Sequence, residues 1–324
     1  MWRYIVQRLL WLIVIIVCVA ILIFSVLFFV PGDPAVTALG AESSDQDRFE
    51  WREMYGLNDS YLEQLGRYLY DTFIRFDMGD SYITHQPVAK EFVSRLPRTL
   101  GLGILCLVVN VGLGIPLGIA CALNHNKFFD HFLTVLAMIG VCMPAFWLAL
   151  LMQQLFAVNW QLLPAIGCDT WQAWIMPIVA GSISGVAGNV RQTRSAVLET
   201  IRADFITTAR AKGVPENKVI YKHMLPNALI PILSMLGGAF GHVISGTVII
   251  ETVFAFPGVG MYMLTGTSNR DYPVVRSTVL ILAVFAAVVV LLVDLAYGMV
   301  DPRIKAQFIS YAQKKPAKVK KEAA

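Results

Sequence analysis

Long runs of apolar residues dominate the chain, and polar residues collect in the segments between them. Six runs reach roughly the 17 to 25 residues that a helix needs to cross a hydrocarbon core about 30 Å thick. Because only a helix satisfies its own backbone hydrogen bonds in lipid, each run predicts a transmembrane helix. The predicted spans are residues 9–30, 100–123, 132–158, 174–190, 228–250 and 277–300.

The first run has the basic flank of a secretory signal peptide, because Arg3 and Arg8 precede it. Its apolar stretch of about 22 residues is longer than the roughly 7 to 15 residues of a cleavable signal. We therefore expect residues 1–30 to be a short cytoplasmic terminus followed by a retained transmembrane helix.

The distribution of basic residues predicts the orientation. The segment between the third and fourth spans has no Lys or Arg, whereas residues 191–226, between the fourth and fifth, are rich in both. Basic residues near helix ends resist translocation, so residues 191–226 should be cytoplasmic. An even number of spans then places both termini inside, and the Lys-rich tail over 301–324 agrees with this.

A polar, acidic segment over residues 31–97 should lie outside the membrane. Within it, apolar residues recur at helical spacing, namely Leu62, Leu65, Leu69 and Phe73. This pattern predicts a small external helical subdomain that packs on the membrane part.

Composition supports a membrane protein. Hydrophobic residues make up 56% of the chain and charged residues 15%, against roughly 25% charged in soluble domains. The net charge of +4 comes from basic residues beside apolar runs, which favours membrane topology over nucleic-acid binding. The five cysteines include no C-x-x-C pair, so we expect small apolar fillers and no disulfide framework or metal site.

Enzymatic motifs are missing from the sequence. It contains no G-x4-G-K-[S/T] loop to bind nucleotide phosphates, no H-E-x-x-H and no G-x-S-x-G. We therefore expect this chain to have no catalytic residues and to bind no cofactor or metal.

The basic segment 191–226 predicts two short amphipathic helices. Asp204 can cap the first, Gly213 suits its end, and Pro215 suits the first turn of the second, before Leu225 and Pro226. One side of the first helix would carry Phe205, Ile206 and Ala209. Small residues beside them would let a partner's groove approach closely. A solvated connector would explain the pattern equally well on physical grounds alone.

A sequence run in this loop carries a family resemblance. Residues 207–213 read T-T-A-R-A-K-G, and H-M-L-P follows after nine residues. This run resembles the EAA loop of ABC importer permeases, E-A-A-x3-G-x9-I-x-L-P. Thr207, Thr208 and His223 replace its Glu, first Ala and Ile, so a charge at position 207 has no role here. The expected coupling residues are Asp204, Thr207, Thr208, Ala209, Arg210, Ala211, Lys212, Gly213, Leu225 and Pro226.

Further motifs resemble the dipeptide, oligopeptide and nickel branch of that family and occur in the same order along nearly the whole chain. They are PGDP at 31–34, GDS at 79–81, QPV at 86–88, MPAFWL at 143–148, ETVF at 251–254, FPGVG at 256–260, RDYPV at 270–274, VDL at 293–295 and DPR at 301–303. The shared order makes chance agreement very improbable.

The resemblance implies an all-α, polytopic type I ABC importer permease with six transmembrane helices, an external helical subdomain after the first and a permease core over 98–300. It implies a second, homologous permease subunit, two cytoplasmic ATPases that bind ATP and magnesium, and an external solute-binding protein. The loop would dock in the ATPase, and the chain would lie in a bacterial or archaeal plasma membrane.

Polar residues inside the spans are candidates for the translocation path, because polar side chains seldom face lipid. These candidates are Asn110, Ser182, Asn189, His242 and Ser245. Hydrogen bonds between helices would account for most of them equally well. His242 alone is no metal site, because a nickel ion would need two or three further ligands.

The predicted function is import of dipeptides or oligopeptides, with nickel or a chelated metal as the alternative cargo within the family. A stand-alone secondary transporter is the alternative from another class. That class predicts inverted repeats, and none is visible in the sequence.

Overall fold

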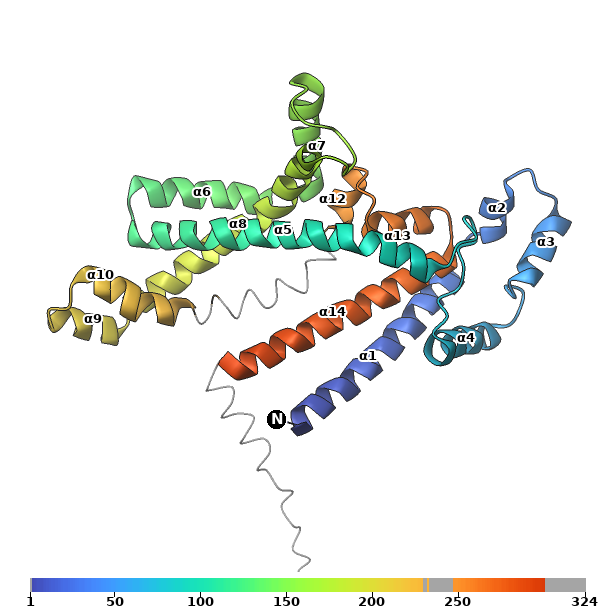
Figure 1. Ribbon diagram of the computed structural model, residues 1–324, viewed down its shortest axis with the longest axis horizontal. Coiled ribbons are helices and arrows are strands. Elements are labelled where there is room, and N and C mark those ends of the chain that lie inside the picture. Colours follow the sequence, from blue (N-terminus) through green and yellow to red (C-terminus); the bar gives the residue numbers. More distant parts are fainter. Residues whose placement is uncertain (1, 230–231, 233–246, 301–324) are drawn as a thin grey trace, which may run out of the picture.

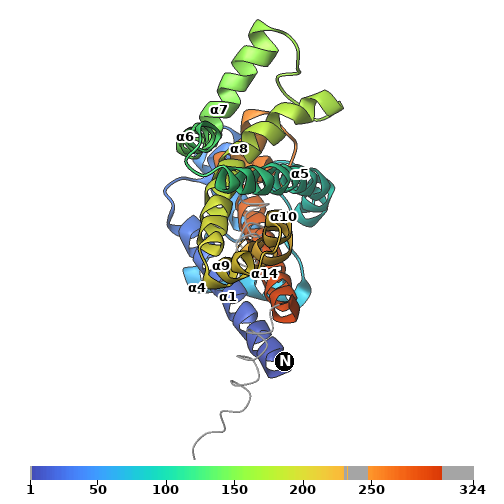
Figure 2. The same cartoon turned by 90° about the vertical axis from the view of Figure 1, so that its left-hand side faces the viewer.

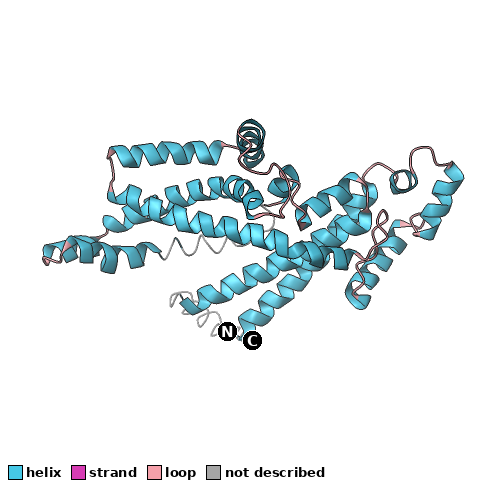
Figure 3. Cartoon of the chain, turned by 45° about the horizontal axis from the view of Figure 1, so that its top comes forward, coloured by secondary structure: helices cyan, strands magenta, loops and turns pink. Residues whose placement is uncertain are grey.

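The chain forms a helical molecule with its long helices gathered in a bundle (Figure 1). This computed structural model describes residues 2–229, 232 and 247–300, and side chains between 6 and 292 within those ranges. The described residues form no strand beyond one isolated bridge between Asp80 and Pro87 (Figure 3). The described elements are α1 (Trp2–Phe29), α2 (Pro34–Leu39), α3 (Asp45–Met54), α4 (Tyr61–Tyr70), the π-helix η1 (Asp71–Arg75), α5 (Val88–Leu123), α6 (Phe128–Cys142), α7 (Ala145–Met152), the π-helix η2 (Gln153–Asn159), α8 (Trp171–Ile201), α9 (Asp204–Ala211), α10 (Glu216–Lys218), the π-helix η3 (Val219–Met224), α12 (Val248–Val253), α13 (Val259–Ser268) and α14 (Tyr272–Val300).

Four described helices are long and apolar enough to cross a membrane, and a bent pair would make a fifth span. The four are Val6–Phe29, Val88–Leu123, Trp171–Ile201 and Tyr272–Leu292. They correspond to the first, second, fourth and sixth predicted spans. Most of the fifth, over 228–250, lies outside the described residues, so the count of six stays a prediction.

The third predicted span is not one continuous helix, and this part of the prediction is wrong. α6 ends at Cys142, and α7 continues with η2 to Asn159 at an angle of 99° (Figure 2). The break falls at Met143 and Pro144. Pro144 has no N–H and disfavours helical geometry at the residue before it, and Met143 is accordingly extended, with φ −76° and ψ 122°.

α5 and α8 form the most extensive helix contact of the described residues. Gly114 and Gly118 of α5 lie against Asn189 and Thr193 of α8, so closely that a Cβ on either glycine would lie within 2.6 Å of a side-chain carbon. Two small residues four positions apart share one helix face and let the backbones approach closely. α5 begins at Val88, within residues 31–97 of the predicted external subdomain and before the predicted start of the permease core at residue 98.

The segment between α1 and α5 contains α2, α3 and α4, which gather at one end of the molecule (Figure 1). The predicted helix is present as α4 and η1. Its residues Leu65, Leu69 and Phe73 pack with Phe24 of α1, as their spacing predicts. Leu62 does not, because its side chain is 75% exposed.

Segments far apart in the sequence are joined beside this unit. The Asp271 carboxylate, only 3% exposed, accepts a hydrogen bond of 2.5 Å from the Ser81 hydroxyl and one of 3.1 Å from the N–H of Tyr82. Ser277 of α14 donates to the carbonyl of Met78 at 2.8 Å. Three of the predicted motif segments therefore meet at this end, because the Arg270 guanidinium also lies against Gly32.

We expect Gly118→Ala to destabilise the protein, because its Cβ would lie 2.8 Å from the carbonyl oxygen of Val190, a backbone atom that has little room to move. Overpacking of this kind costs about 1–3 kcal/mol. Gly112→Ala is the matched control, since no atom lies within 4 Å of its Cβ position. Thermal unfolding in detergent should show a lower midpoint for Gly118→Ala alone. Equal midpoints for both variants would contradict the close helix contact.

Candidate functional site

The loop after α8 folds onto the ends of α5 and α8, at the end of the molecule opposite α2–α4 (Figure 1). Ile206 and Ala209 of α9 and Val219 and Met224 of η3 are buried there, 0 to 9% exposed. They form one cluster with Ala122, Val197 and Ala228. Two short helices are present as predicted, and apolar packing holds them against the ends of α5 and α8.

α9 ends in a backbone turn at Gly213, in agreement with the prediction. Gly213 has φ +73°, a left-handed conformation in which a residue with a Cβ is strained. Its N–H donates to the carbonyl of Arg210 at 2.9 Å, and the N–H of Val214 donates to that of Ala209 at 3.2 Å. These two bonds are the Schellman arrangement, and Val214 and Ala209 also pack in the same apolar cluster.

Two details of the predicted α9 are wrong. Its N-cap is Ala203, in extended conformation, and Asp204 is the first helical residue with no side-chain cap bond. A carboxylate in the first turn still favours the helix through the positive end of its dipole. Phe205 does not share the buried side with Ile206 and Ala209, because its side chain is 45% exposed.

The outward face of the loop is polar with two exposed aromatic rings. Phe205 is 45% exposed and Tyr221 is 71% exposed. Neither ring belongs to the expected coupling set, of which the exposed members are Asp204, Thr207, Thr208, Arg210, Ala211, Lys212, Gly213 and Pro226. Leu225 is partly buried against the apolar cluster, at the start of a helical stretch over 225–229.

An ion pair joins α9 to α10 across the turn. Arg210 donates to both carboxylate oxygens of Glu216, at 3.1 and 2.6 Å. This hydrogen bonding raises the pKa of Arg210 and lowers the pKa of Glu216. Since the Glu216 pKa is lowered on folding, its contribution to stability is present above the unfolded pKa and is lost as the pH falls through the folded pKa. The pair is therefore intact at neutral pH.

A buried ion pair that the sequence pattern does not indicate lies close to this loop. Asp130 at the start of α6 is fully buried, and Arg194 of α8 binds it through two hydrogen bonds of 2.6 and 2.8 Å. The N–H of Asn126 also donates to Asp130 at 3.0 Å. His125 Nδ1 lies 3.4 Å from the same carboxylate. In the sequence, Arg194 is one of the basic residues that indicate the orientation of the 191–226 segment, and its position gives no sign of this partner.

The polar residues proposed for the translocation path are partly brought together. Asn189 of α8 donates from Nδ2 to the carbonyl of Asn110 of α5 at 3.2 Å, across the contact between the two helices. Ser182 donates to the carbonyl of Val179 in its own helix at 3.2 Å. This is the helix-packing alternative, and a role in transport stays a prediction. His242 and Ser245 lie outside the described residues.

Glu251 organises the turn that precedes α13. Its carboxylate is fully buried and accepts hydrogen bonds from the N–H groups of Gly260 and Met261, at 2.8 and 3.1 Å, and from the Thr247 hydroxyl at 3.1 Å. A Cβ at Gly258 would lie 2.4 Å from this carboxyl group. The carboxylate thus binds the free N–H groups at the start of a helix, where a negative charge is favoured.

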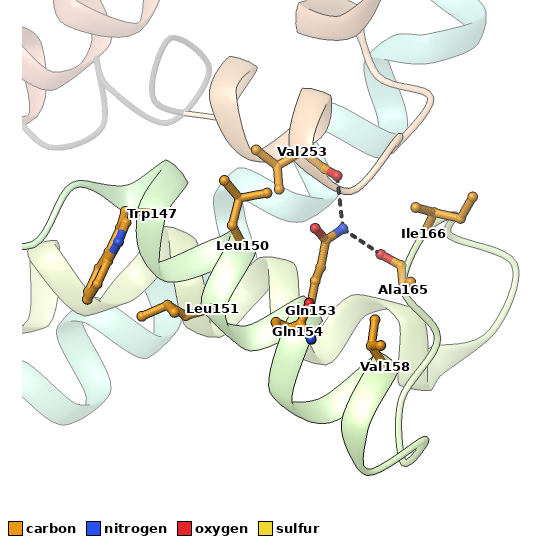
Figure 4. Close-up of a pocket in the computed structure, with 9 residues that line it drawn as sticks. All are labelled: Trp147, Leu150, Leu151, Gln153, Gln154, Val158, Ala165, Ile166 and Val253. Atoms are coloured by element: carbon orange, nitrogen blue, oxygen red, sulfur yellow. Dashed lines mark hydrogen bonds between the residues drawn. The ribbon is translucent and has the colours of Figure 1, made fainter.

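A groove of about 610 Å³ lies beside the bent pair α7–η2 (Figure 4). Gln153 spans it and donates from Nε2 to the carbonyls of Ala165 and Val253, at 2.8 and 2.9 Å. Its lining side chains carry no charge, and the remaining ones are apolar except Gln154. The groove therefore offers contact surface and no reactive group.

Apolar helices long enough to span a bilayer, bundled through small residues, define a polytopic membrane protein. A family model described as binding-protein-dependent transport system inner membrane component matches residues 114–306, and a model of the N-terminal part of such components matches residues 1–103. The chain belongs to this family of inner-membrane transport components. Membership implies ATPase and solute-binding partners, and it argues against a stand-alone secondary transporter.

Named relatives cover nearly the whole chain. A dipeptide transport system permease protein, DppB, of Alkalihalophilus pseudofirmus is 37% identical over 94% of this chain and 100% of its own length. A glutathione transport system permease protein, GsiC, of Salmonella typhimurium is 35% identical over 94% of this chain and 99% of its own. These relatives are transport subunits.

Solved structures share the fold. The inward-facing MetNI methionine ABC transporter aligns with a TM-score of 0.56 and 17% identity over 65% of this chain and 97% of its own. An amino acid ABC transporter solved with histidines aligns with a TM-score of 0.53 and 16% identity, covering 66% and 94%.

We expect Arg194→Ala to destabilise the protein by about 3 kcal/mol, because the buried Asp130 would lose its partner. Removing both charges, in Asp130→Ala with Arg194→Ala, should restore part of that loss. Thermal unfolding of the wild type, both single variants and the double variant in detergent gives the coupling energy. Additive losses would show that the two charges do not interact.

Proposed function

We infer that this chain is a permease subunit of an ATP-driven importer and forms half of the translocation path for short peptides. The observation that supports this most is its similarity to dipeptide and glutathione permeases over 94% of its length. Glutathione is itself a short peptide, so both named cargoes belong to one chemical class.

The alternative cargo, nickel or a chelated metal, has no specific support. The described residues hold no group of three His, Cys, Asp or Glu side chains able to bind a metal ion. The relatives named above are permeases for a dipeptide and for glutathione.

The proposed mechanism is mechanical. The outward face of the 204–226 loop docks on a separate ATPase, and ATP-driven closure of two ATPases pulls the loops of two permease subunits together. The apolar cluster under α9 and η3 supports this, because a loop packed on α5 and α8 moves those helices with it. The second permease subunit and the docking site are parts of this proposal.

The proposed orientation places this loop and both termini in the cytoplasm and the α2–α4 unit outside. The basic residues of the loop support it. An external solute-binding protein would deliver peptide at the α2–α4 end, and ATP and magnesium would bind the partner ATPases. Co-purification from native membranes tests the proposed partners and cargo. It identifies the subunits that remain bound to this chain and the ligand that the external protein holds.

We expect Gly213→Pro to abolish peptide uptake and stimulation of the ATPase while membrane insertion is retained. Proline cannot adopt φ +73°, and it removes the N–H that closes the turn on Arg210. A bulky replacement, Ala209→Phe, should act in the same way by displacing α9 from its cluster. Uptake into proteoliposomes and ATP hydrolysis by the same complex are the measurements. ATP-coupled uptake at the wild-type rate in a folded, inserted variant would refute the loop assignment.

We expect Tyr221→Ala and Phe205→Ala to weaken binding of the ATPase, because exposed aromatic rings are frequent anchors of protein interfaces. Each should reduce affinity by about tenfold, or roughly 1.4 kcal/mol. Trp171→Ala is the control, since Trp171 is 72% exposed and begins α8, at the end of that helix away from the loop. Affinity is measured by titrating the purified ATPase onto the reconstituted permease. Unchanged affinity in both loop variants would place the docking surface elsewhere.

A further inference from the structure

Two adjacent cavities lie between α1, α14 and the α2–α4 unit, outside the sites described above. Their volumes are about 260 and 220 Å³, and they share the lining residues Phe24, Leu57, Gln64, Tyr82 and Arg276. Arg276 of α14 therefore stands in the wall between them. Figure 1 shows α1 and α14 side by side, with α4 at their common end.

Arg276 is a half-buried cation that lacks an anionic partner among the described residues. Its guanidinium lies 4.9 Å from the centre of the Tyr68 ring, and its Nε is buried without a hydrogen bond. A cation–π contact offsets only part of the cost of removing a charge from water. The arrangement favours an anion beside Arg276.

The larger cavity has the chemistry of an anion site. Two guanidinium groups, Arg52 and Arg276, and one carboxylate, Asp33, line it, so this cavity by itself has one positive charge in excess. The adjoining cavity adds Arg67 and Asp71, which pair with Asp59 and Arg75, and the exposed Asp80. Asp33 lies 3.5 Å from Arg52, a loose ion pair. The hydroxyls of Tyr82 and Tyr272 also line it and make no hydrogen bond within the described residues. Burial raises the pKa of Tyr82 to about 12, so its hydroxyl stays a donor at neutral pH.

The other wall of this cavity is apolar and belongs to the end of a membrane span. Leu27 and Phe28 of α1 line the cavity, and the span ends at Phe29. From Phe28 an exposed apolar stripe continues down α1 through Ile21 and Val14, at 38, 37 and 49% exposure. A spacing of seven residues keeps these side chains on one helix face. An acyl chain can follow this stripe away from the cavity.

We propose that this cavity binds a singly charged phosphate group, with Arg276 as its counter-ion and the phosphodiester of a membrane phospholipid as its source. One negative charge balances the excess, the tyrosine hydroxyls donate to phosphate oxygens, and Leu27 and Phe28 contact the glycerol and acyl portion. The lipid would join α1, α14 and the α2–α4 unit at the membrane boundary. Inorganic phosphate shares the anionic chemistry but lacks the apolar portion. The inference is independent of the transported cargo.

Native mass spectrometry of the detergent-purified permease complex tests the proposal. The ligands are phosphatidylglycerol, inorganic phosphate, and diacylglycerol with the same acyl chains and no phosphate. The variants are Arg276→Gln, Arg276→Lys, which keeps the charge, and Arg98→Gln, a control at an exposed arginine of another span.

Wild type, Arg276→Lys and Arg98→Gln should each retain one bound phosphatidylglycerol. The affinity of Arg276→Gln for phosphatidylglycerol should be about tenfold lower. Diacylglycerol should show no difference between these proteins. If inorganic phosphate binds the wild type but not Arg276→Gln, and displaces the lipid, the result would support an anion site. It would overturn the proposal that the anion comes from a lipid. Equal phosphatidylglycerol affinity in wild type and Arg276→Gln would overturn the proposal.

A second variant keeps the test open if Arg276→Gln fails to fold. Tyr82→Phe removes a donor hydroxyl and keeps the ring that packs against Trp51. It should weaken phosphatidylglycerol binding severalfold in a protein that elutes as a single species. A monodisperse Tyr82→Phe protein with wild-type affinity would overturn the proposed contacts.

Discussion

Direct contact between the backbones of α5 and α8 is the constraint on which the rest of the structure depends. Gly114 and Gly118 leave the surface of α5 bare where Asn189 and Thr193 of α8 cross it. The same two helices then hold other segments at both of their ends. At one end they hold the 204–226 loop, and at the other they pack against α12 and the turn that follows it. A displacement of the loop is therefore passed to one tightly packed helix pair.

Buried carboxylates mark the places where separate segments join. Asp130, Glu251 and Asp271 are each at most 3% exposed, and each has its own partners: Arg194, backbone N–H groups of the next helix, and Ser81 with the N–H of Tyr82. Burying a charge is costly unless it is paired and hydrogen-bonded. These carboxylates thus favour one pairing of segments over the alternatives that apolar packing alone would allow.

The apolar runs were sufficient to predict α1, α5, α8 and α14, because length and hydropathy directly reflect the requirement to span a bilayer. The turn at Gly213 was predictable for a similar reason, since few residues other than glycine suit that backbone conformation. The apolar run over 132–158 does not predict the bend at Pro144, because hydropathy indicates the length of a span and not the direction of its helix axis. The exposure of Leu62 and Phe205 depends on which other helices pack against them, and helical spacing along the sequence does not identify those helices.

The pairing of Asp130 with Arg194 could not be predicted, because 64 positions separate the two residues and either one alone resembles an end-of-helix charge. The proposed coupling role of the loop rests on a family resemblance, since physical reasoning leaves a solvated connector equally open. Packing explains why this loop has a definite shape. It does not identify what the outward face binds.

In the loop after α8, the residues that fix the backbone conformation differ from those that form its outer surface. Main-chain hydrogen bonds at Gly213 and Val214 fix the reversal of the chain, and aliphatic side chains on the inner face fix its position. Thr207, Thr208 and Ala211 point outward and serve neither purpose. The fold of the loop therefore does not constrain these outer side chains, and a duplicated gene can acquire a new binding preference while the architecture of its loop is inherited unchanged.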